Sequence, residues 1–182
     1  MMNLFDPSLI VCMDTETTGL GPDAEICQLA IIDYDEKPLM SELIKPYGRI
    51  PPEATAIHGI TDKMVRDKRP IDYYWPHLMG SLLSGKIVLG YNVTYDVRML
   101  FQSAQQAARR NDLGLNKSLS PLAIIDVMMA FKRHQKLTKW TRLSEACTVC
   151  GFDTKDLDVK FHDALYDATI TLRIFKYLET LS

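Results

Sequence analysis

Two acidic residues directly after an apolar segment are the first feature of this sequence that could carry chemistry. Leu9–Met13 is a short apolar run typical of a buried strand, and Asp14 and Glu16 follow it. Residues two apart in a strand point to the same face, so the two carboxylates should lie side by side. Without a basic neighbour, such a pair either has a raised pKa or binds a cation. Taken alone, the pair is more simply a polar turn that ends a strand.

Two later segments add further acidic residues. Asp96 follows an apolar segment, and we expect it in the first turn of a helix, where the helix dipole favours a carboxylate for purely structural reasons. His162 and Asp167 are five residues apart in the sequence, which is about 140° around a helix axis. They cannot both face one site from within one regular helix. We therefore expect His162 in a loop and Asp167 on the following helix, with Asp163 near the helix start in a structural role.

The elements that must position these residues alternate along the chain. Short apolar runs predict strands at Leu9–Met13, Ile26–Tyr34, Leu39–Ile44, Ile87–Tyr91 and Ala123–Asp126. Helices are predicted at Ile71–Leu83, Thr94–Arg109, Met128–Phe131, Arg142–Val149 and Asp163–Leu181, with Asn92 or Thr94 capping the second. Gly48–Ala54 contains two prolines and is predicted to be a loop. This order predicts an α/β domain with a mixed sheet flanked by helices.

The acidic segments, taken in order, resemble the three motifs of the DnaQ-like DEDDh exonuclease family. The motifs are Asp14-x-Glu-x-Thr-Gly, Asn92-x-x-Tyr-Asp and His162-x-x-x-x-Asp. Ile57-His58-Gly59-Ile60-Thr61 is similar to the His-Gly-Ile segment of the epsilon proofreading subfamily, and Ile125-Asp126-Val127 takes the place of a recurrent Asp-Thr segment. The resemblance implies a ribonuclease-H-like fold with a five-stranded mixed sheet.

The same resemblance implies a reaction: metal-dependent removal of nucleotides from a 3′ end, with release of nucleoside 5′-monophosphates. Carboxylates suit Mg²⁺ or Mn²⁺, and two such cations can serve phosphodiester hydrolysis. By resemblance, the ligands of two divalent cations are Asp14, Glu16, Asp96 and Asp167, the general base is His162, and the contacts to the terminal nucleotide are Thr17, Leu20 and His58. The His-Gly-Ile segment favours DNA over RNA, and the expected substrate is single-stranded DNA. An RNA-directed enzyme of the same fold and a non-catalytic nucleic-acid-binding module are the alternatives.

Composition is that of an ordinary globular protein. The 182 residues, 47% hydrophobic and 24% charged, predict a single exonuclease domain over residues 1–182. Lys plus Arg number 21 and Asp plus Glu 23, so the formal charge of −2 argues against a protein that holds duplex DNA by phosphate neutralisation alone. No apolar run approaches the roughly 20 residues of a membrane-spanning helix, so no membrane association is expected.

The cysteines and the chain ends bear on compartment and partners. Four cysteines do not form a recognisable disulfide framework, and Cys147 and Cys150 lack the second pair that a zinc site needs. With no secretory signal at the start, the cytoplasm is the expected compartment. The chain ends at Ser182, directly after the last predicted helix, whereas epsilon subunits carry a further tail that binds the polymerase. A polymerase partner therefore stays open, as does the oligomeric state, and a stand-alone, mobile-element or viral enzyme is an alternative.

Overall fold

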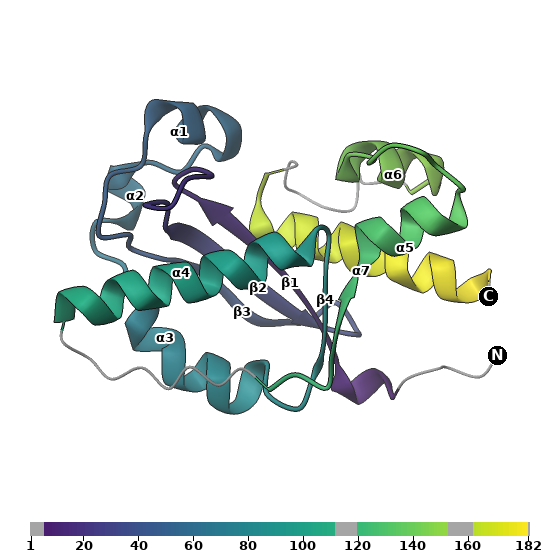
Figure 1. Cartoon of the computed structure of the whole chain (residues 1–182), viewed down its shortest axis with the longest axis horizontal. Helices are drawn as coiled ribbons and strands as arrows, with labels where there is room; N and C mark the ends of the chain where they lie inside the picture. The colour runs from purple at the N-terminus through teal and green to yellow at the C-terminus, as the bar shows by residue number, and fades with distance from the viewer. Residues whose placement is uncertain (1–5, 112–119, 153–161, 182) are drawn as a thin grey trace.

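The structure, a computed structural model, describes residues 6–111, 120–152 and 162–181 (Figure 1). Its strands are β1 (Ile10–Thr17), β2 (Ile26–Asp33), β3 (Pro38–Leu43), β4 (Ile87–Gly90) and β5 (Ala123–Asp126). Its helices are α1 (Pro52–His58), α2 (Asp62–Val65), α3 (Ile71–His77), α4 (Val93–Asn111), α5 (Val127–His134), α6 (Leu143–Val149) and α7 (Ala164–Thr180). Two short turns, η1 (Pro7–Leu9) and η2 (Leu78–Leu82), precede β1 and follow α3.

The five strands form one mixed sheet in the order β3-β2-β1-β4-β5. β2 runs antiparallel to both β1 and β3, whereas β4 runs parallel to both β1 and β5. The predicted fold class, a five-stranded mixed sheet flanked by helices, is therefore confirmed. β1 is longer than the apolar run that predicted it and continues through Thr17, so that Asp14 and Glu16 lie inside the strand and pair in register with Ala30 and Gln28 of β2.

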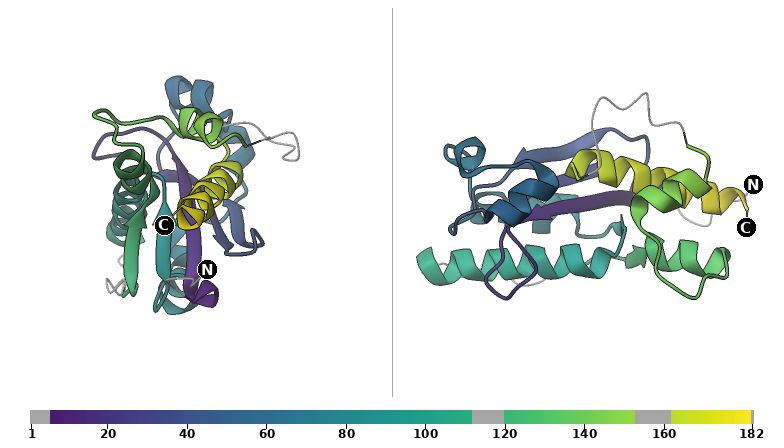
Figure 2. Two further views of the ribbon diagram at one scale, coloured as in Figure 1. Left: turned by 90° about the vertical axis from the view of Figure 1, so that its right-hand side faces the viewer. Right: turned by 90° about the horizontal axis from the view of Figure 1, so that it is seen from above.

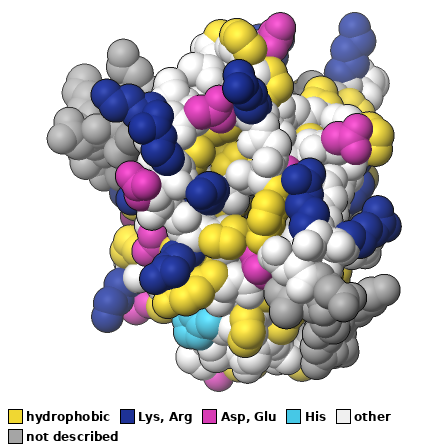
Figure 3. Space-filling view, turned by 90° about the vertical axis from the view of Figure 1, so that its left-hand side faces the viewer, with side chains coloured by type: hydrophobic (Ala, Val, Ile, Leu, Met, Phe, Trp, Pro, Cys, Tyr) yellow, Lys and Arg dark blue, Asp and Glu magenta, His cyan; other side chains and the backbone are white. Residues whose placement is uncertain are grey.

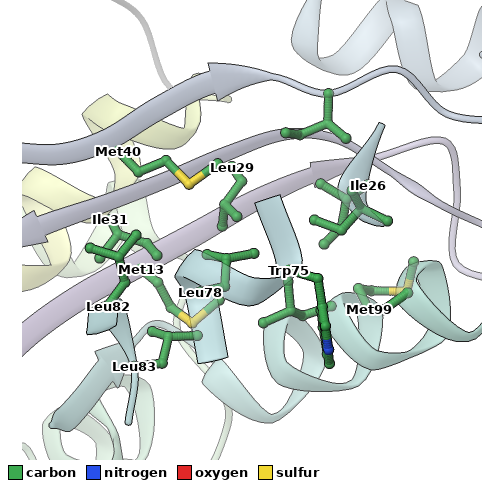
Figure 4. Packing of buried hydrophobic residues seen from close by; sticks show 14 of the residues in the cluster. Met13, Ile26, Leu29, Ile31, Met40, Trp75, Leu78, Leu82, Leu83 and Met99 are labelled. Carbon is green, nitrogen blue, oxygen red and sulfur yellow. The ribbon is translucent and has the colours of Figure 1, made fainter. Parts of the chain in front are cut away.

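Helices cover both faces of the sheet. α4 and α7 lie on opposite sides of it (Figure 2). Alternate residues of β1 divide between two apolar clusters: Val11 and Met13 pack with α3 and α4, whereas Ile10 and Cys12 pack with α5, α6 and α7. Figure 4 shows Met13 within the first cluster, beside Ile31 of β2 and Leu82 of η2. The same alternation directs the even-numbered Asp14 and Glu16 to the α7 side.

The chain between β3 and β4 differs from the prediction at α2, which was not predicted, and at two further stretches. Gly48–Ala54 was predicted to be a loop because of its prolines, but α1 begins inside it. Pro51 is extended at the N-cap and Pro52 takes the first helical position, where a missing N–H costs nothing. The single helix predicted over residues 71–83 is instead α3, with Pro76 inside it, followed by the π-helical turn η2.

The second half of the chain follows the prediction to within two or three residues at most ends. α4 contains Asp96 in its first turn, as expected. Asp163 is the N-cap of α7, His162 lies just before that helix, and Asp167 lies in its first turn, which is the arrangement that their spacing predicted. Among the described residues, no helix combines the length and apolarity needed to cross a membrane.

Candidate active site

The three acidic motifs meet beside the C-terminal end of β1. A carboxylate oxygen of Glu16, a ring nitrogen of His162 and a carboxylate oxygen of Asp167 all lie within 4.8 Å of one another. Glu16 and Asp167 are buried, whereas His162 is exposed at the rim. β1 and the first turn of α7 therefore bring together residues that are about 150 positions apart in the sequence, counted from 16 to 167.

Asp96 reaches the same region from the first turn of α4. Its buried carboxylate accepts a hydrogen bond of 2.7 Å from the Thr15 hydroxyl, which points to the α4 side of the sheet. Burial raises the pKa of Asp96 to about 7, and the hydrogen bond from Thr15 acts against this rise. Thr15 lies between Asp14 and Glu16 in β1, so this hydrogen bond holds Asp96 against the same strand.

The electrostatics of the site are those of a metal-free acidic cluster. Burial, and then the charges of Asp96, Asp167 and Glu16, raise the pKa of Asp14 well above its ordinary value. Burial and the charge of Asp167 raise the pKa of Glu16 to about 8, and burial raises the pKa of Asp167 to about 7. The four carboxylates therefore lie close enough to oppose one another's ionisation, which is the condition under which a cation would bind.

Asp167 has one carboxylate oxygen that receives no hydrogen bond from the described residues. Its Oδ2 accepts a hydrogen bond of 3.2 Å from the backbone N–H of His162. Its Oδ1 is buried and, within the described part of the chain, has no hydrogen-bond partner. A buried carboxylate oxygen without a donor is costly unless a cation binds it. The donor set, made of hard carboxylate oxygens, fits Mg²⁺ or Mn²⁺.

A buried glutamine that the sequence reasoning missed anchors the start of α7. The Gln28 amide donates to Asp163 Oδ2 at 3.0 Å, and its carbonyl oxygen accepts from the Ala164 N–H at 3.1 Å. Asp163 Oδ1 in turn caps the helix by accepting from the backbone N–H groups of residues 165 and 166. Because Gln28 pairs in register with Glu16, one strand pair positions both sides of the acidic cluster. An isolated amide inside the apolar segment of β2 was the signal that could have identified it.

Of the residues expected to contact a terminal nucleotide, Thr17 ends β1, Leu20 lies in the turn after it, and His58, at the end of α1, contacts Thr17. The His58 ring accepts from the Ile60 N–H at Nδ1 (3.0 Å), so its Nε2–H is the donor to the Thr17 carbonyl oxygen at 3.3 Å. Burial lowers the pKa of His58, which favours this neutral form. The Thr17 hydroxyl lies 2.8 Å from the Tyr95 hydroxyl. Leu20 has 78% of its surface exposed and leaves its side chain available to a ligand.

Asp126, which lies where the family has its recurrent Asp-Thr segment, makes structural hydrogen bonds. Its Oδ1 accepts from the backbone N–H groups of Met128 and Met129, and it therefore caps α5. The same oxygen accepts from the Asn92 N–H at 3.1 Å, where the chain turns with a positive φ of 64° into α4. Asp126 thus ties the end of β5 to the segment that leads to Asp96.

The order of the strands and the acidic cluster at the end of the central strand define a nuclease of ribonuclease-H-like fold. The exonuclease family model RNase_T matches residues 11–175. The chain therefore belongs to this family, the DnaQ-like exonucleases, whose members depend on divalent metals and hydrolyse phosphodiester bonds.

Individual relatives agree with this assignment. The chain is 36% identical over 177 residues to uncharacterized exonuclease CP81 of Escherichia phage 186, spanning 92% of this chain and 87% of the phage protein. It is 31% identical over 186 residues to the DNA polymerase III subunit epsilon of Aquifex aeolicus, spanning 98% of this chain and 84% of that subunit. A solved structure of exonuclease X in complex with 5′ overhanging duplex DNA superposes with a TM-score of 0.70 at 27% identity, covering 95% of this chain and 92% of that one.

Proposed function

We propose that this exonuclease removes nucleotides from the 3′ end of single-stranded DNA and releases nucleoside 5′-monophosphates. The observation that carries the proposal is the convergence of Glu16, His162 and Asp167 within 4.8 Å, beside a buried Asp167 oxygen that has no partner among the described residues. The relatives support DNA as the substrate, because one is a subunit of a DNA polymerase and another was solved with DNA.

Four carboxylates would hold the metal in this proposal: Asp14, Glu16, Asp96 and Asp167. When bound, two divalent cations, Mg²⁺ or Mn²⁺, would supply positive charge that activates a water and stabilises charge on the phosphate oxygens and the leaving oxygen. Four negative charges balance two divalent cations, so the occupied site would be near neutral and would accept an anionic phosphodiester.

His162 is proposed as the general base. It lies at the rim of the cluster and is exposed, so a water at the scissile phosphate can reach its imidazole. Imidazole accepts a proton near neutral pH. The backbone N–H of His162 donates to Asp167 Oδ2, so the group that positions the loop is separate from the ring that would accept the proton.

Leu20, Thr17 and His58 are proposed to receive the terminal nucleotide. Leu20 is exposed, whereas the ring nitrogens of His58 and the hydroxyl of Thr17 already bind protein groups. Leu20 would therefore supply apolar contact to the base, and the other two would hold the turn that carries it.

The distribution of surface charge agrees with binding of only a short stretch of nucleic acid. Figure 3 looks onto the end of the molecule that carries α1, α2 and the C-terminal end of α4, where Lys and Arg side chains stand singly among acidic and apolar ones. Among its described residues, this face shows no continuous basic track of the kind that binds a long duplex. We also propose the reducing cytoplasm as the compartment, because all four cysteines, each within the described residues, are free.

Digestion of matched 5′-labelled single-stranded DNA and RNA with Mg²⁺ or Mn²⁺ tests the proposal. A ladder of progressively shortened labelled products from DNA is expected, since 3′ removal leaves the label on the long fragment. Immediate release of a labelled mononucleotide would show that digestion begins at the 5′ end and would refute the proposed polarity. Faster digestion of the RNA would show that RNA, not DNA, is the preferred substrate. Asp14→Asn should abolish cleavage, whereas the matched Asp35→Asn, at an exposed turn, should cleave like the wild type. Full activity in excess chelator would refute metal dependence.

A further inference from the structure

A cavity of about 610 Å³ extends from the acidic cluster toward the connection between α5 and α6. His162 and Asp167 form one part of its lining, and Trp140, Arg142 and Met128 belong to the rest. The cavity is therefore continuous with the proposed reaction site. None of these three residues has a place in the mechanism described above.

Trp140 gives this cavity a surface suited to a nucleobase. It has 58% of its surface exposed, whereas Trp75, the other tryptophan, is 3% exposed in the core. The Lys132 ammonium lies 4.1 Å from the centroid of the Trp140 ring. An exposed aromatic ring combined with cationic side chains is the pattern by which proteins bind single-stranded nucleic acid, since every base can stack and every phosphate is an anion.

The segment that carries Trp140 is held in place by the protein. The Tyr91 hydroxyl, at the end of β4, donates to the Thr141 carbonyl oxygen at 2.6 Å. The Arg142 N–H donates to the Glu145 carboxylate at 3.1 Å and so joins the segment to α6. Binding would therefore cost little ordering of this segment.

The position of the cavity indicates which part of a substrate it would meet. α1, which carries His58, and α6 lie on either side of the start of α7 (Figures 1 and 2). If the terminal nucleotide lies toward Leu20 and His58, the rest of the strand leaves on the α6 side, across the cavity.

We propose that this cavity binds the single strand on the 5′ side of the scissile bond, with a base stacked on Trp140 and a phosphate against Arg142. The inference rests on the proposed exonuclease function. It adds a binding site for a nucleotide that is not the one removed, and it predicts that affinity increases with oligonucleotide length until this site is filled.

Tryptophan fluorescence provides the first test, and it requires no cleavage. (dT)8 is titrated into the Asp14→Asn protein with Mg²⁺, and stacking should quench the emission of the exposed Trp140. Because Trp75 is buried in the core, Trp140→Phe in the same background should show little quenching. Absence of quenching at saturating oligonucleotide would overturn the proposal, whether or not the exonuclease function holds.

An abasic scan then locates the stacked base. Single abasic residues are placed along the oligonucleotide, and one position 5′ of the terminal nucleotide should weaken binding by roughly fivefold to a hundredfold. Trp140→Ala should lose sensitivity at that position alone. Leu137→Ala, an exposed apolar side chain on the same connection but outside the cavity lining, should retain the wild-type profile. An unchanged profile in Trp140→Ala would overturn the assignment.

Kinetics separate this inference from the proposed function. The p-nitrophenyl ester of thymidine 5′-monophosphate has no nucleotide 5′ of the scissile bond, so Trp140→Ala should raise KM far more for (dT)8 than for this ester. Equal KM changes for the two substrates would contradict the cavity assignment while leaving the exonuclease function intact. Failure of the wild type to hydrolyse either substrate would contradict the function, while the fluorescence titration would still decide the cavity.

Discussion

Replacing Glu16 by glutamine should make the stability of the metal-free protein less dependent on pH. Burial and the charge of Asp167 raise the pKa of Glu16 from 4.5, its value in an exposed chain, to about 8. Between these values the folded protein binds a proton that the unfolded chain has released, so stability is highest at low pH and falls as pH rises through this window. Glutamine keeps the shape of the side chain but removes the titration.

The size of this pH dependence follows from the binding of one proton to Glu16. Wherever the folded protein holds one proton that the unfolded chain has released, each pH unit changes the free energy of unfolding by about 1.36 kcal/mol. From pH 6 to pH 8 the folded protein goes from almost full to half protonation at Glu16, so this group alone costs about 2 kcal/mol of stability. Asp96 and Asp167, whose pKa values are raised to about 7, add to the wild-type decline.

Urea unfolding in EDTA at pH 6 and at pH 8, followed by circular dichroism, measures this difference. The decline between the two pH values should be about 2 kcal/mol smaller in Glu16→Gln than in the wild type. Glu42→Gln, the same change at an exposed position on β3, should decline like the wild type. Parallel declines in wild type and Glu16→Gln would refute the view that buried acidic repulsion governs this site.

The remaining predictions concern the metal, the base and the helix start. Saturating Mn²⁺ should raise the Tm of the wild type, because ions that bind only the folded state stabilise it. Calorimetry should show a much smaller rise in Asp14→Asn and Asp167→Asn. Equal rises in all three proteins would mean that the cation binds elsewhere. His162→Ala should lower kcat by roughly 10²–10⁴-fold while keeping most of the Mn²⁺-dependent rise in Tm, and near-normal turnover would remove it from the reaction. Asp163→Ala should cost about 1–2 kcal/mol in urea unfolding through loss of the α7 cap and should also lower kcat, whereas Asp163→Asn, which can still cap, should lose less stability.

Most of the fold could be predicted from the sequence, because its strands are short apolar runs with clear limits. The spacing of His162 and Asp167 was sufficient to place one before α7 and the other on it. The loop predicted over Gly48–Ala54 is wrong, because Pro52 occupies the first position of α1, where a helix tolerates proline well. The π-helical turn after α3 has no periodicity that an apolar pattern would reveal.

The supporting contacts of the site required the tertiary structure. Gln28 anchors Asp163 across 135 sequence positions, and Thr15 binds Asp96 across 81, so no local pattern connects either pair. His58 was predicted to contact a nucleotide from its motif alone, and only the fold places its Nε2 beside the Thr17 carbonyl oxygen. Its contact with a nucleotide stays a prediction, as do the assigned roles of the four carboxylates and His162.

The backbone conformation of His162 lowers the stability of the folded protein at the residue proposed as the general base. This residue has a φ of 72°, in the left-handed region that costs a side-chain-bearing residue roughly 1–2 kcal/mol. His162→Gly should therefore raise the Tm of the metal-free protein, even though it removes the proposed base. If His162 is the base, as proposed, a library of variants selected only for survival after heating would enrich glycine at position 162 and lose nuclease activity at the same time. On the proposed role of His162, engineering for heat resistance in this protein should keep this residue constant and stabilise other positions.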